Sequence, residues 1–308
     1  MSTSVDNRAM QAREDGTMQG SGGNLARRQA LGNWMLLAPG VIWMSACLVL
    51  PMLMMIYVSF WTQTTFAIND TPTFDNWVAF FSTPTYLGSL LTTVRLWIVT
   101  LLLIFVIGYP VAVFIGLFVR NKTLQTSLLV LCVVPFWTSF LIRVVAWRPM
   151  LGTEGAVNII LLKLGLISHP IEALLFTQYS VIIGMVQIYV VFMVGPVAFM
   201  VSRIDRSLIE AARDLGAGTA RIFFTIILPL SLPGIVVGAI FVSVMVLGEF
   251  ATPAALSGDK VNLLGNIIVT QVGSLKWAFA SVCGVILTVL MAVTVVALLR
   301  IVNLRREI

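Results

Sequence analysis

The sequence predicts an all-α integral membrane protein with six transmembrane helices. Of its 308 residues, 59% are apolar and 10% are charged, against roughly 45–50% and 25% in soluble domains. A soluble domain of this size could not bury so much apolar surface. The charged residues also leave long neutral windows, and each can hold the ~20 residues that cross a bilayer. The composition therefore argues against a cytosolic enzyme, a nucleic-acid-binding protein and a disordered regulator.

The transmembrane helices are predicted from windows that lack Asp, Glu, Lys and Arg. Windows 76–94 and 261–275 also lack charges, but Asn, Thr, Ser, Gly and Pro interrupt them, so we expect loops or interfacial helices there. The predicted spans lie near residues 33–61, 94–119, 125–147, 177–201, 231–256 and 277–300.

The N-terminal segment 1–28 differs in kind from the rest of the chain. It is rich in Gly, Ser, Gln and Asn and carries Arg but almost no large apolar side chains. We expect a disordered polar tail on the cytoplasmic side, followed by a permease domain over 29–308. The apolar stretch after the tail is longer than the core of a signal peptide, so the first span is expected to remain as an uncleaved anchor.

The distribution of basic residues predicts the orientation. The tail, the 120–123 turn, the 202–230 loop and the C-terminal stretch hold 13 of the 19 Lys and Arg residues, whereas loop 62–93 holds none. Six spans place both termini on one side, and the positive-inside rule makes that side the cytoplasm. The net charge of +6 therefore reports topology, and no nucleic-acid partner is needed to explain it.

Residues suited to metal binding or catalysis are scarce. His169 is the only histidine, and the three cysteines lie far apart within apolar runs. These residues form no metal-ligand spacing and no Ser-His triad. We expect no metal site, no resident cofactor and no covalent chemistry in this chain.

The loop at 202–230 carries the clearest local signals. Ser207 and Glu210 have the spacing of a capping box at a helix start, and Gly216 or Gly218 can end that helix. A second short helix is expected from Thr219 to Ile227, stopped by Pro229. Four residues of the first helix form an apolar stripe at i, i+3, i+4 and i+7: Leu208, Ala211, Ala212 and Leu215.

An exposed apolar stripe flanked by charges suits docking into a groove of a partner protein. The alternative is an amphipathic helix that lies on the lipid surface. The composition of the loop alone does not separate the two interpretations.

The same loop resembles the EAA loop of binding-protein-dependent ABC importer permeases. The family pattern Glu-Ala-Ala-x3-Gly-x9-Ile-x-Leu-Pro is matched at every defined position, by Glu210, Ala211, Ala212, Gly216, Ile226, Leu228 and Pro229. The resemblance implies a type I ABC importer permease-like fold in the bacterial inner membrane. It also implies that this loop couples the membrane helices to a separate ATPase subunit.

The partners follow from the same resemblance. It implies two copies of an ATP-binding subunit, a second permease in a heterodimer or homodimer, and an extracytoplasmic solute-binding protein. The chain contains no Walker Gly-x4-Gly-Lys-Ser/Thr sequence, so ATP and Mg²⁺ would be used by the ATPase subunit.

Two further segments resemble the spermidine/putrescine branch of these permeases: Val134–Arg143, followed by Ala146 and Trp147, and Leu247–Pro253. Related permeases for ferric ligands, opines, amino-acid derivatives and other small solutes share much of this pattern. The solute predicted from the resemblance is a polyamine, and the other small solutes remain alternatives.

Glu249 is the acidic residue deep in an apolar stretch, where a carboxylate is costly and suggests function. It could attract a polyamine ammonium group, with aromatic faces offered by Trp137, Trp147, Phe250 and Tyr189. Alternatively, it lies near the outer end of the fifth span and pairs with Arg143 or another base. A third reading is an ion-coupled secondary transporter in which Glu249 relays a proton or another ion. A non-transport membrane scaffold is a further class of function, but no residue pattern in the sequence favours it.

Overall fold

A computed structural model of the chain describes residues 38–63, 68–258 and 260–303. Within these residues, five helices are long and apolar enough to cross a membrane, and six spans result if one bent helix pair counts as a single span. The predicted all-α membrane architecture is confirmed. The N-terminal tail 1–28 lies outside the described residues, so its predicted disorder stays a prediction.

The helix Ala38–Val58 corresponds to the first predicted span. All of its residues except Val58 belong to a compact unit that ends at Tyr57. Its 21 residues give a length of about 31 Å, close to the thickness of the hydrocarbon core. Residues 33–37 of the predicted span lie outside the described part of the chain.

The remaining unit begins at Val58 and contains the elements that the family resemblance concerns. Most of its helices are α-helices, with 3₁₀ segments at η2 and η3 and π-helical segments at η1 and η4. In chain order the elements are β1 Trp61–Gln63, β2 Ile68–Pro72, α2 Asp75–Ser82, α3 Pro84–Val113, η1 Phe114–Phe118, α4 Lys122–Val133, η2 Val134–Trp137, α5 Phe140–Val145, α6 Trp147–Leu151, α7 Ala156–Lys163, η3 Glu172–Leu174, α8 Gln178–Val201, α9 Arg206–Asp214, α10 Thr219–Ile222, η4 Phe223–Ile227, α11 Leu228–Leu247, α12 Ala251–Leu256, α13 Leu264–Gly273 and α14 Trp277–Asn303.

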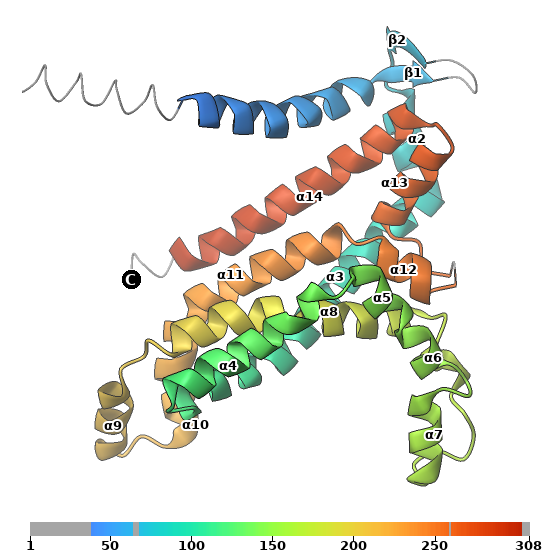
Figure 1. Cartoon of the computed structure of the whole chain (residues 1–308). Helices are drawn as coiled ribbons and strands as arrows, with labels where there is room; N and C mark the ends of the chain where they lie inside the picture. Colours follow the sequence, from blue (N-terminus) through green and yellow to red (C-terminus); the bar gives the residue numbers. More distant parts are fainter. Residues whose placement is uncertain (1–37, 64–67, 259, 304–308) are drawn as a thin grey trace, which may run out of the picture. The chain divides into compact units, whose positions relative to one another are not determined.

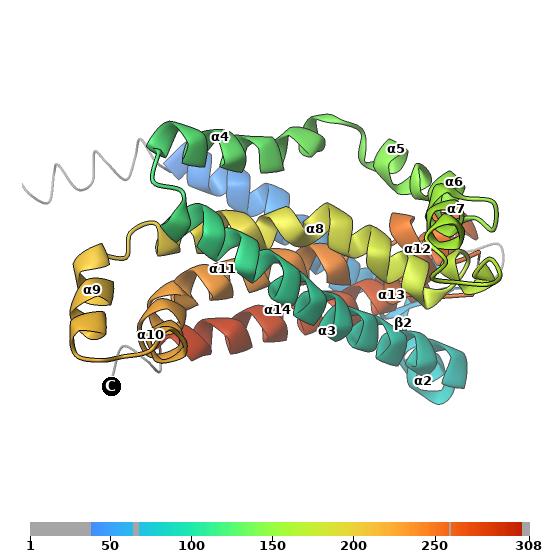
Figure 2. The same cartoon turned by 90° about the horizontal axis from the view of Figure 1, so that it is seen from below.

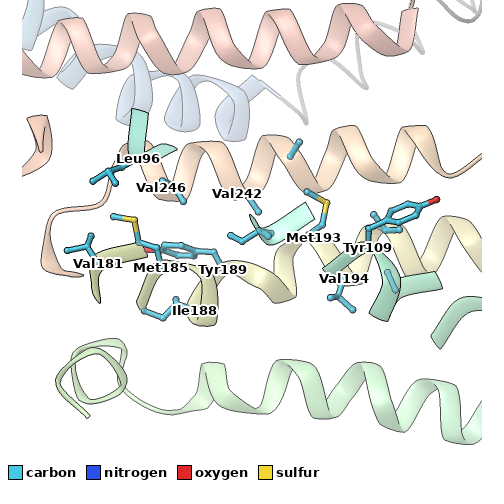
Figure 3. Packing of buried hydrophobic residues seen from close by; sticks show 14 of the residues in the cluster. Leu96, Tyr109, Val181, Met185, Ile188, Tyr189, Met193, Val194, Val242 and Val246 are labelled. Carbon is cyan, nitrogen blue, oxygen red and sulfur yellow. The ribbon is translucent and has the colours of Figure 1, made fainter. Parts of the chain in front are cut away.

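The main core forms around α8, which packs against both α3 and α11 (Figures 1 and 2). Figure 3 shows buried side chains from these three helices meeting along the length of α8. The labelled residues are Leu96 and Tyr109 of α3, Val181, Met185, Ile188, Tyr189, Met193 and Val194 of α8, and Val242 and Val246 of α11.

Two glycines let α11 approach α8 closely. A Cβ atom on Gly234 would lie 2.7 Å from the Pro196 carbonyl oxygen, and one on Gly238 would lie 3.1 Å from the Met193 Cα atom. Since both distances join the added carbon to backbone atoms, larger residues would push the helices apart. This Gly-x-x-x-Gly spacing therefore sets the α8–α11 distance.

A second, smaller core joins α2, α13 and α14. A short antiparallel hairpin of β1 and β2 precedes α2, and the Asn76 side-chain amide donates to the Trp61 carbonyl oxygen at 2.9 Å. The fully buried members of this core include Phe80 of α2, Leu264 of α13 and Val282 of α14.

The functional elements lie at opposite ends of this unit. In both views, α9, α10 and the C-terminal end of α14 lie at one end, and α6, α7, α12 and α13 lie at the other (Figures 1 and 2). The long helices α3, α8, α11 and α14 connect the two ends. These helices therefore join α9 to the far end of the unit.

The second predicted span begins too late. The helix starts at Pro84, not near residue 94, and it runs to Val113 before continuing as η1. The hydroxyls of Thr92 and Thr93 each donate to the carbonyl four residues earlier. Because those hydroxyls are satisfied within their own helix, the polar residues before position 94 do not interrupt it.

The third predicted span is not a continuous helix. The segments Lys122–Trp137 and Phe140–Lys163 are bent by 92° at a short break. Pro135 lacks a backbone N–H, the chain tightens into η2, and Thr138 and Ser139 take extended conformations. A window without charges does not report such a break, so the third span, expected near 125–147, is a bent pair of helices.

The fifth predicted span has different limits at both ends. Helical structure runs without interruption from Thr219 to Leu247, and the chain then breaks at Gly248 before the short helix α12. The fourth and sixth spans agree closely with prediction, since α8 and α14 begin at Gln178 and Trp277. The window 261–275, expected to be a loop or an interfacial helix, contains the ten-residue helix α13.

Candidate functional site

The helix α9 forms the first half of the loop identified from the sequence, and Asp205 is its N-cap. The Asp205 carboxylate accepts a hydrogen bond of 3.0 Å from the Ser207 backbone N–H. That bond holds the pKa of Asp205 below its usual range. The predicted capping box of Ser207 and Glu210 is wrong, because the helix starts two residues earlier than the box requires and a carboxylate supplies the cap.

The helix α9 presents two opposite faces. The predicted apolar stripe is exposed, with Leu208 50% and Leu215 89% accessible. Glu210 lies on the other face, where it lines a cavity together with Arg206 and Arg213. With 3.6 residues per turn, these two sets point in nearly opposite directions. The stripe is therefore free to contact another molecule, while Glu210 faces the membrane helices.

Gly216 ends α9 as predicted. Its φ of +81° lies in the left-handed region, which favours glycine. The Gly216 N–H donates to the Arg213 carbonyl at 2.8 Å, and the next N–H, of Ala217, donates to the Ala212 carbonyl at 2.9 Å. Gly218 has an ordinary φ of −69°, so the turn requires a glycine at 216 and not at 218.

The second half of the loop joins directly to the membrane helix. The predicted stop at Pro229 is wrong, because α10, η4 and α11 run on as one helix and Pro229 lies in the first turn of α11. Proline is tolerated in a first turn, and the π-helical segment before it changes the hydrogen-bond pattern. Ile226 and Leu228 are half-buried on either side of the junction between η4 and α11.

Two polar contacts link the elements around this loop, one from α9 to η1 and one from α3 to α11, and the sequence did not reveal either of them. The Arg206 guanidinium donates from Nη2 to the Leu117 carbonyl at 2.8 Å. Inside the bundle, the Tyr109 hydroxyl of α3 and the Ser231 hydroxyl of α11 lie 3.0 Å apart. In the sequence, Arg206 does not differ from the other basic residues of the loop, and Tyr109 does not differ from other aromatic residues in apolar segments. No sequence signal therefore indicates either contact.

A cavity of about 340 Å³ lies between α9 and the membrane helices. One wall comes from the end of α3, from η1 and from the turn after them, and another comes from α10 and η4. The residues that line it are Val113, Leu117, Phe118, Arg120, Arg206, Ile209, Glu210, Arg213, Thr219, Ile222, Phe223 and Ile227. Glu210 is the candidate site residue that this cavity contains.

At the opposite end of α11, Glu249 caps α12. One carboxylate oxygen accepts hydrogen bonds from the N–H groups of Ala251 and Thr252 at 2.8 and 3.0 Å. The other accepts a hydrogen bond from the Tyr189 hydroxyl. Glu249 is only 5% exposed, so these bonds replace the water that a buried carboxylate loses. The structure thus brings together two of the five solute-path candidates.

Arg143, the alternative partner named for Glu249, contacts an aromatic ring. The Arg143 guanidinium lies 4.8 Å from the centre of the Phe136 ring, and within the part of the chain that the structure describes no salt bridge joins it to Glu249. Glu249 is instead held by two backbone amides and a hydroxyl. Of the two readings of Glu249, the structural one, pairing with Arg143 or another base, agrees with the geometry in that Glu249 holds helices together, but its partners are the Tyr189 hydroxyl and two backbone amides.

The other three solute-path candidates are more dispersed. Trp147 donates from its indole N–H to Gln187 of α8 at 3.4 Å. Trp137 is 83% exposed at the break after η2, and the side chain of Phe250 is also exposed. Among the described residues, no group of three or more His, Cys, Asp or Glu side chains is arranged to hold a metal ion.

Comparison with protein families identifies the class of this architecture. Residues 105–307 match the family described as "Binding-protein-dependent transport system inner membrane component". The matched range includes α8, α9, the cavity residues from α10 and η4, and the Tyr189–Glu249 contact.

Curated relatives match over most of the chain. The spermidine/putrescine transport system permease protein PotB of Haemophilus influenzae is 36% identical over 258 residues, which cover 82% of this chain and 88% of that protein. The PotB protein of Escherichia coli K12 is 36% identical over 251 residues, which cover 81% and 90%. In both relatives the aligned region extends far beyond a single shared motif.

A solved structure shares the fold. A bacterial ABC transporter involved in the import of the acidic polysaccharide alginate contains a chain that superimposes with a TM-score of 0.70 at 21% identity, covering 89% of this chain and 96% of that chain. The solved structure shows a type I importer permease fold, and the family match and the relatives show a multi-pass inner-membrane permease and not an enzyme. The chain belongs to the binding-protein-dependent transport system inner membrane component family, the membrane-spanning permease subunits of ABC importers.

Proposed function

We propose that this permease imports a polyamine and that α9 is the helix through which an ATPase subunit drives it. The observation that carries the proposal is the exposed stripe of α9, where Leu208 and Leu215 are accessible at the end of the bundle. Apolar side chains on a protruding helix gain free energy when a partner covers them. The match to all seven positions of the EAA loop supports an ATPase subunit as that partner.

The partners complete the transport cycle. Two ATPase copies bind and hydrolyse ATP with Mg²⁺, a second permease forms the other half of the pathway, and an extracytoplasmic binding protein delivers the solute. We further propose that both termini and α9 are cytoplasmic. The basic side chains of the α9 loop support this orientation, since cytoplasmic loops are enriched in Lys and Arg.

The contacts around the loop suggest how motion passes into the membrane. The bond from Arg206 to Leu117 links α9 to the end of the helix that begins at Pro84. The Tyr109–Ser231 contact then links α3 to α11. When the ATPase subunits close, α9 moves with them, and these contacts carry the displacement into α3 and α11 together.

The solute assignment rests on the relatives. Two PotB proteins at 36% identity cover more than four fifths of the chain, and their names specify spermidine and putrescine. A direct contact between Glu249 and an ammonium group would compete with the hydrogen bonds that both of its oxygens already accept. Opines, amino-acid derivatives and ferric ligands are the alternative solutes.

A reconstituted transporter tests the energy source. The full chain would be placed in proteoliposomes with its second permease, ATPase subunits and binding protein. We expect uptake of labelled spermidine to require MgATP on the side of the membrane that carries the ATPase subunits. Uptake should stop when the Walker lysine of the ATPase is replaced. Uptake that persists without the ATPase and follows an ion gradient would instead support a secondary transporter.

The solute is tested with the same preparation. Putrescine, spermidine, an opine, an amino-acid derivative and a ferric ligand are offered at equal concentration, and binding to the solute-binding protein is measured in parallel. We expect saturable uptake of the polyamines alone. A binding protein that binds only anions would contradict the polyamine assignment and leave the importer class intact.

A further inference from the structure

We propose that the cavity between α9 and the ends of the membrane helices binds the phosphate group of an anionic membrane phospholipid. The cavity has a volume of about 340 Å³, which is room for on the order of ten water molecules. This volume suits a phosphate with its glycerol, while the acyl chains would continue along the membrane helices outside it.

The lining of the cavity combines basic side chains, which suit a phosphate, with apolar side chains, which suit the glycerol and the start of the acyl chains. Arg120, Arg206 and Arg213 supply basic groups, and Leu117 and Ile222 are among the apolar residues beside them. Basic pockets between membrane helices are a recurring mode of lipid headgroup recognition. Arginine suits this role because its planar guanidinium can donate two parallel hydrogen bonds to a phosphate.

The balance of charge favours an anion. Three arginines face the cavity together with one carboxylate, that of Glu210, so the lining carries a formal excess of two positive charges. Arg206 is held in place by its bond to the Leu117 carbonyl. Arg120 and Arg213 are exposed at the cavity, and no hydrogen bond or salt bridge of their side chains is found within the described residues.

The position of the cavity favours a lipid over a soluble anion. It opens where one apolar membrane helix ends, at η1, and beside η4 in the first turns of another, the helix that begins at Thr219. The side chains of Phe114, Phe118 and Phe224 are exposed there, at 58%, 71% and 64%, and the rings of Phe114 and Phe118 stack with centroids 6.2 Å apart. Exposed phenylalanine rings are apolar and can insert at the boundary between lipid headgroups and acyl chains.

The geometry of α9 also separates this cavity from the docking stripe. The cavity-facing residues Arg206, Glu210 and Arg213 lie on the face opposite Leu208 and Leu215. A partner that covers the stripe therefore leaves the cavity directed toward the membrane. This is why we assign the cavity to a lipid and not to the ATPase subunit.

The test measures lipid retention by the purified full-length chain, using native mass spectrometry with phosphatidylglycerol or phosphatidylcholine added. The key variant is Arg120→Gln/Arg213→Gln, since Arg206 also has a structural bond. We expect its affinity for phosphatidylglycerol to fall about fivefold for each arginine replaced, about 25-fold in total. Affinity for phosphatidylcholine, measured in the same titration, should stay within twofold of wild type.

Three controls make the result specific. Arg221→Gln removes a charge from α10, outside the cavity lining, and should leave phosphatidylglycerol binding within twofold of wild type. Arg120→Lys/Arg213→Lys retains the charges and should recover most of the binding, which also shows that the chain folds. Millimolar inorganic phosphate should not displace the lipid.

Four results would overturn the proposal. They are unchanged binding by Arg120→Gln/Arg213→Gln, an equal loss in Arg221→Gln, displacement of the lipid by inorganic phosphate, and release of the lipid when the ATPase subunit is added. The third would indicate a site for a free anion, and the fourth would assign the cavity to the ATPase interface. Because the readout is lipid binding, none of these results depends on which solute the permease carries.

Discussion

The Tyr189 hydroxyl of α8 donates a hydrogen bond to the Glu249 carboxylate at the break between α11 and α12. The same carboxylate accepts hydrogen bonds from the first two backbone N–H groups of α12. A single buried side chain thus fixes a helix break to the central helix of the bundle. The neighbouring Ser180 hydroxyl donates to the Leu256 carbonyl at 2.9 Å, so α12 is held to α8 at both of its ends.

Replacement of Tyr189 by Phe removes the hydroxyl and keeps the ring. The carboxylate then loses one buried donor, and we expect the free energy of unfolding to fall by roughly 1–2 kcal/mol. The measurement is a denaturant titration of the purified chain in mixed micelles. The matched control is Tyr179→Phe on the same helix, where the ring is 58% exposed, and its expected change is below about 0.5 kcal/mol.

A companion variant separates charge from hydrogen bonding at the same site. Glu249→Gln keeps an oxygen that can accept the α12 amides, whereas Glu249→Ala leaves those amides without a partner. We therefore expect Glu249→Ala to be the less stable of the two by at least 1 kcal/mol, on the order of a lost helix cap. Equal stability of the two variants would show that the cap contributes nothing to α12.

Replacement of Gly216 by Ala tests the turn that ends α9. Because φ is +81° there, an alanine would cost roughly 1–2 kcal/mol and would favour a different end to the helix. We expect weaker ATPase binding and slower uptake. The control is Gly218→Ala, because φ is −69° at that position and no atom lies within 4 Å of the added carbon. A loss of uptake in both variants, or in neither, would contradict the assigned role of the turn.

The Asp205 cap predicts a pH dependence of the start of α9. Since the folded-state pKa of Asp205 is lowered by the Ser207 N–H, the carboxylate stabilises the helix at pH values above the ordinary aspartate pKa of about 3.9. That stabilisation is lost as the pH falls through the lowered value. Hydrogen exchange of the first amides of α9, corrected for intrinsic rate, should therefore show reduced protection below about pH 4.

Asp205→Asn provides the comparison for this prediction. Asparagine also accepts a hydrogen bond at an N-cap but does not titrate, so protection of the same amides should no longer change across that range. Asp214→Asn, at the other end of α9, should behave as the wild type does. If all three proteins lose protection together, the acid effect arises elsewhere.

The distribution of charged residues predicted much of the fold. Windows without charges located α8 and α14 to within a few residues, because these helices are apolar along nearly their whole length. The same windows missed the start of α3 at Pro84 and the break after Leu247. Hydropathy does not distinguish a threonine that bonds within its own helix from one that ends a helix, and it does not report where a buried carboxylate caps a break.

The candidate site was predictable where it depends on local sequence. The stripe of α9 and the turn at Gly216 follow from spacing and from the need for glycine at positive φ. The contacts between Arg206 and Leu117 and between Tyr109 and Ser231 join residues 89 and 122 positions apart. Such pairs depend on how α3 packs against the rest of the bundle, and no pattern along a single sequence records that packing.

Docking of the ATPase subunit on the exposed stripe of α9 is tested most directly by replacing its two leucines. The variant is Leu208→Ser/Leu215→Ser. The matched control is Leu164→Ser/Leu166→Ser, since both leucines are exposed, at 66% and 67%, in the turn after α7 at the opposite end of the unit. Co-purification of the ATPase subunit and ATP-driven uptake are measured for both.

We expect the stripe variant to lose most of the bound ATPase subunit and at least tenfold of its uptake rate, since two apolar contacts of about 1.5–3 kcal/mol each are removed. The control should retain both. Normal ATPase association and uptake by Leu208→Ser/Leu215→Ser, or an equal loss in Leu164→Ser/Leu166→Ser, would contradict docking on this face of α9.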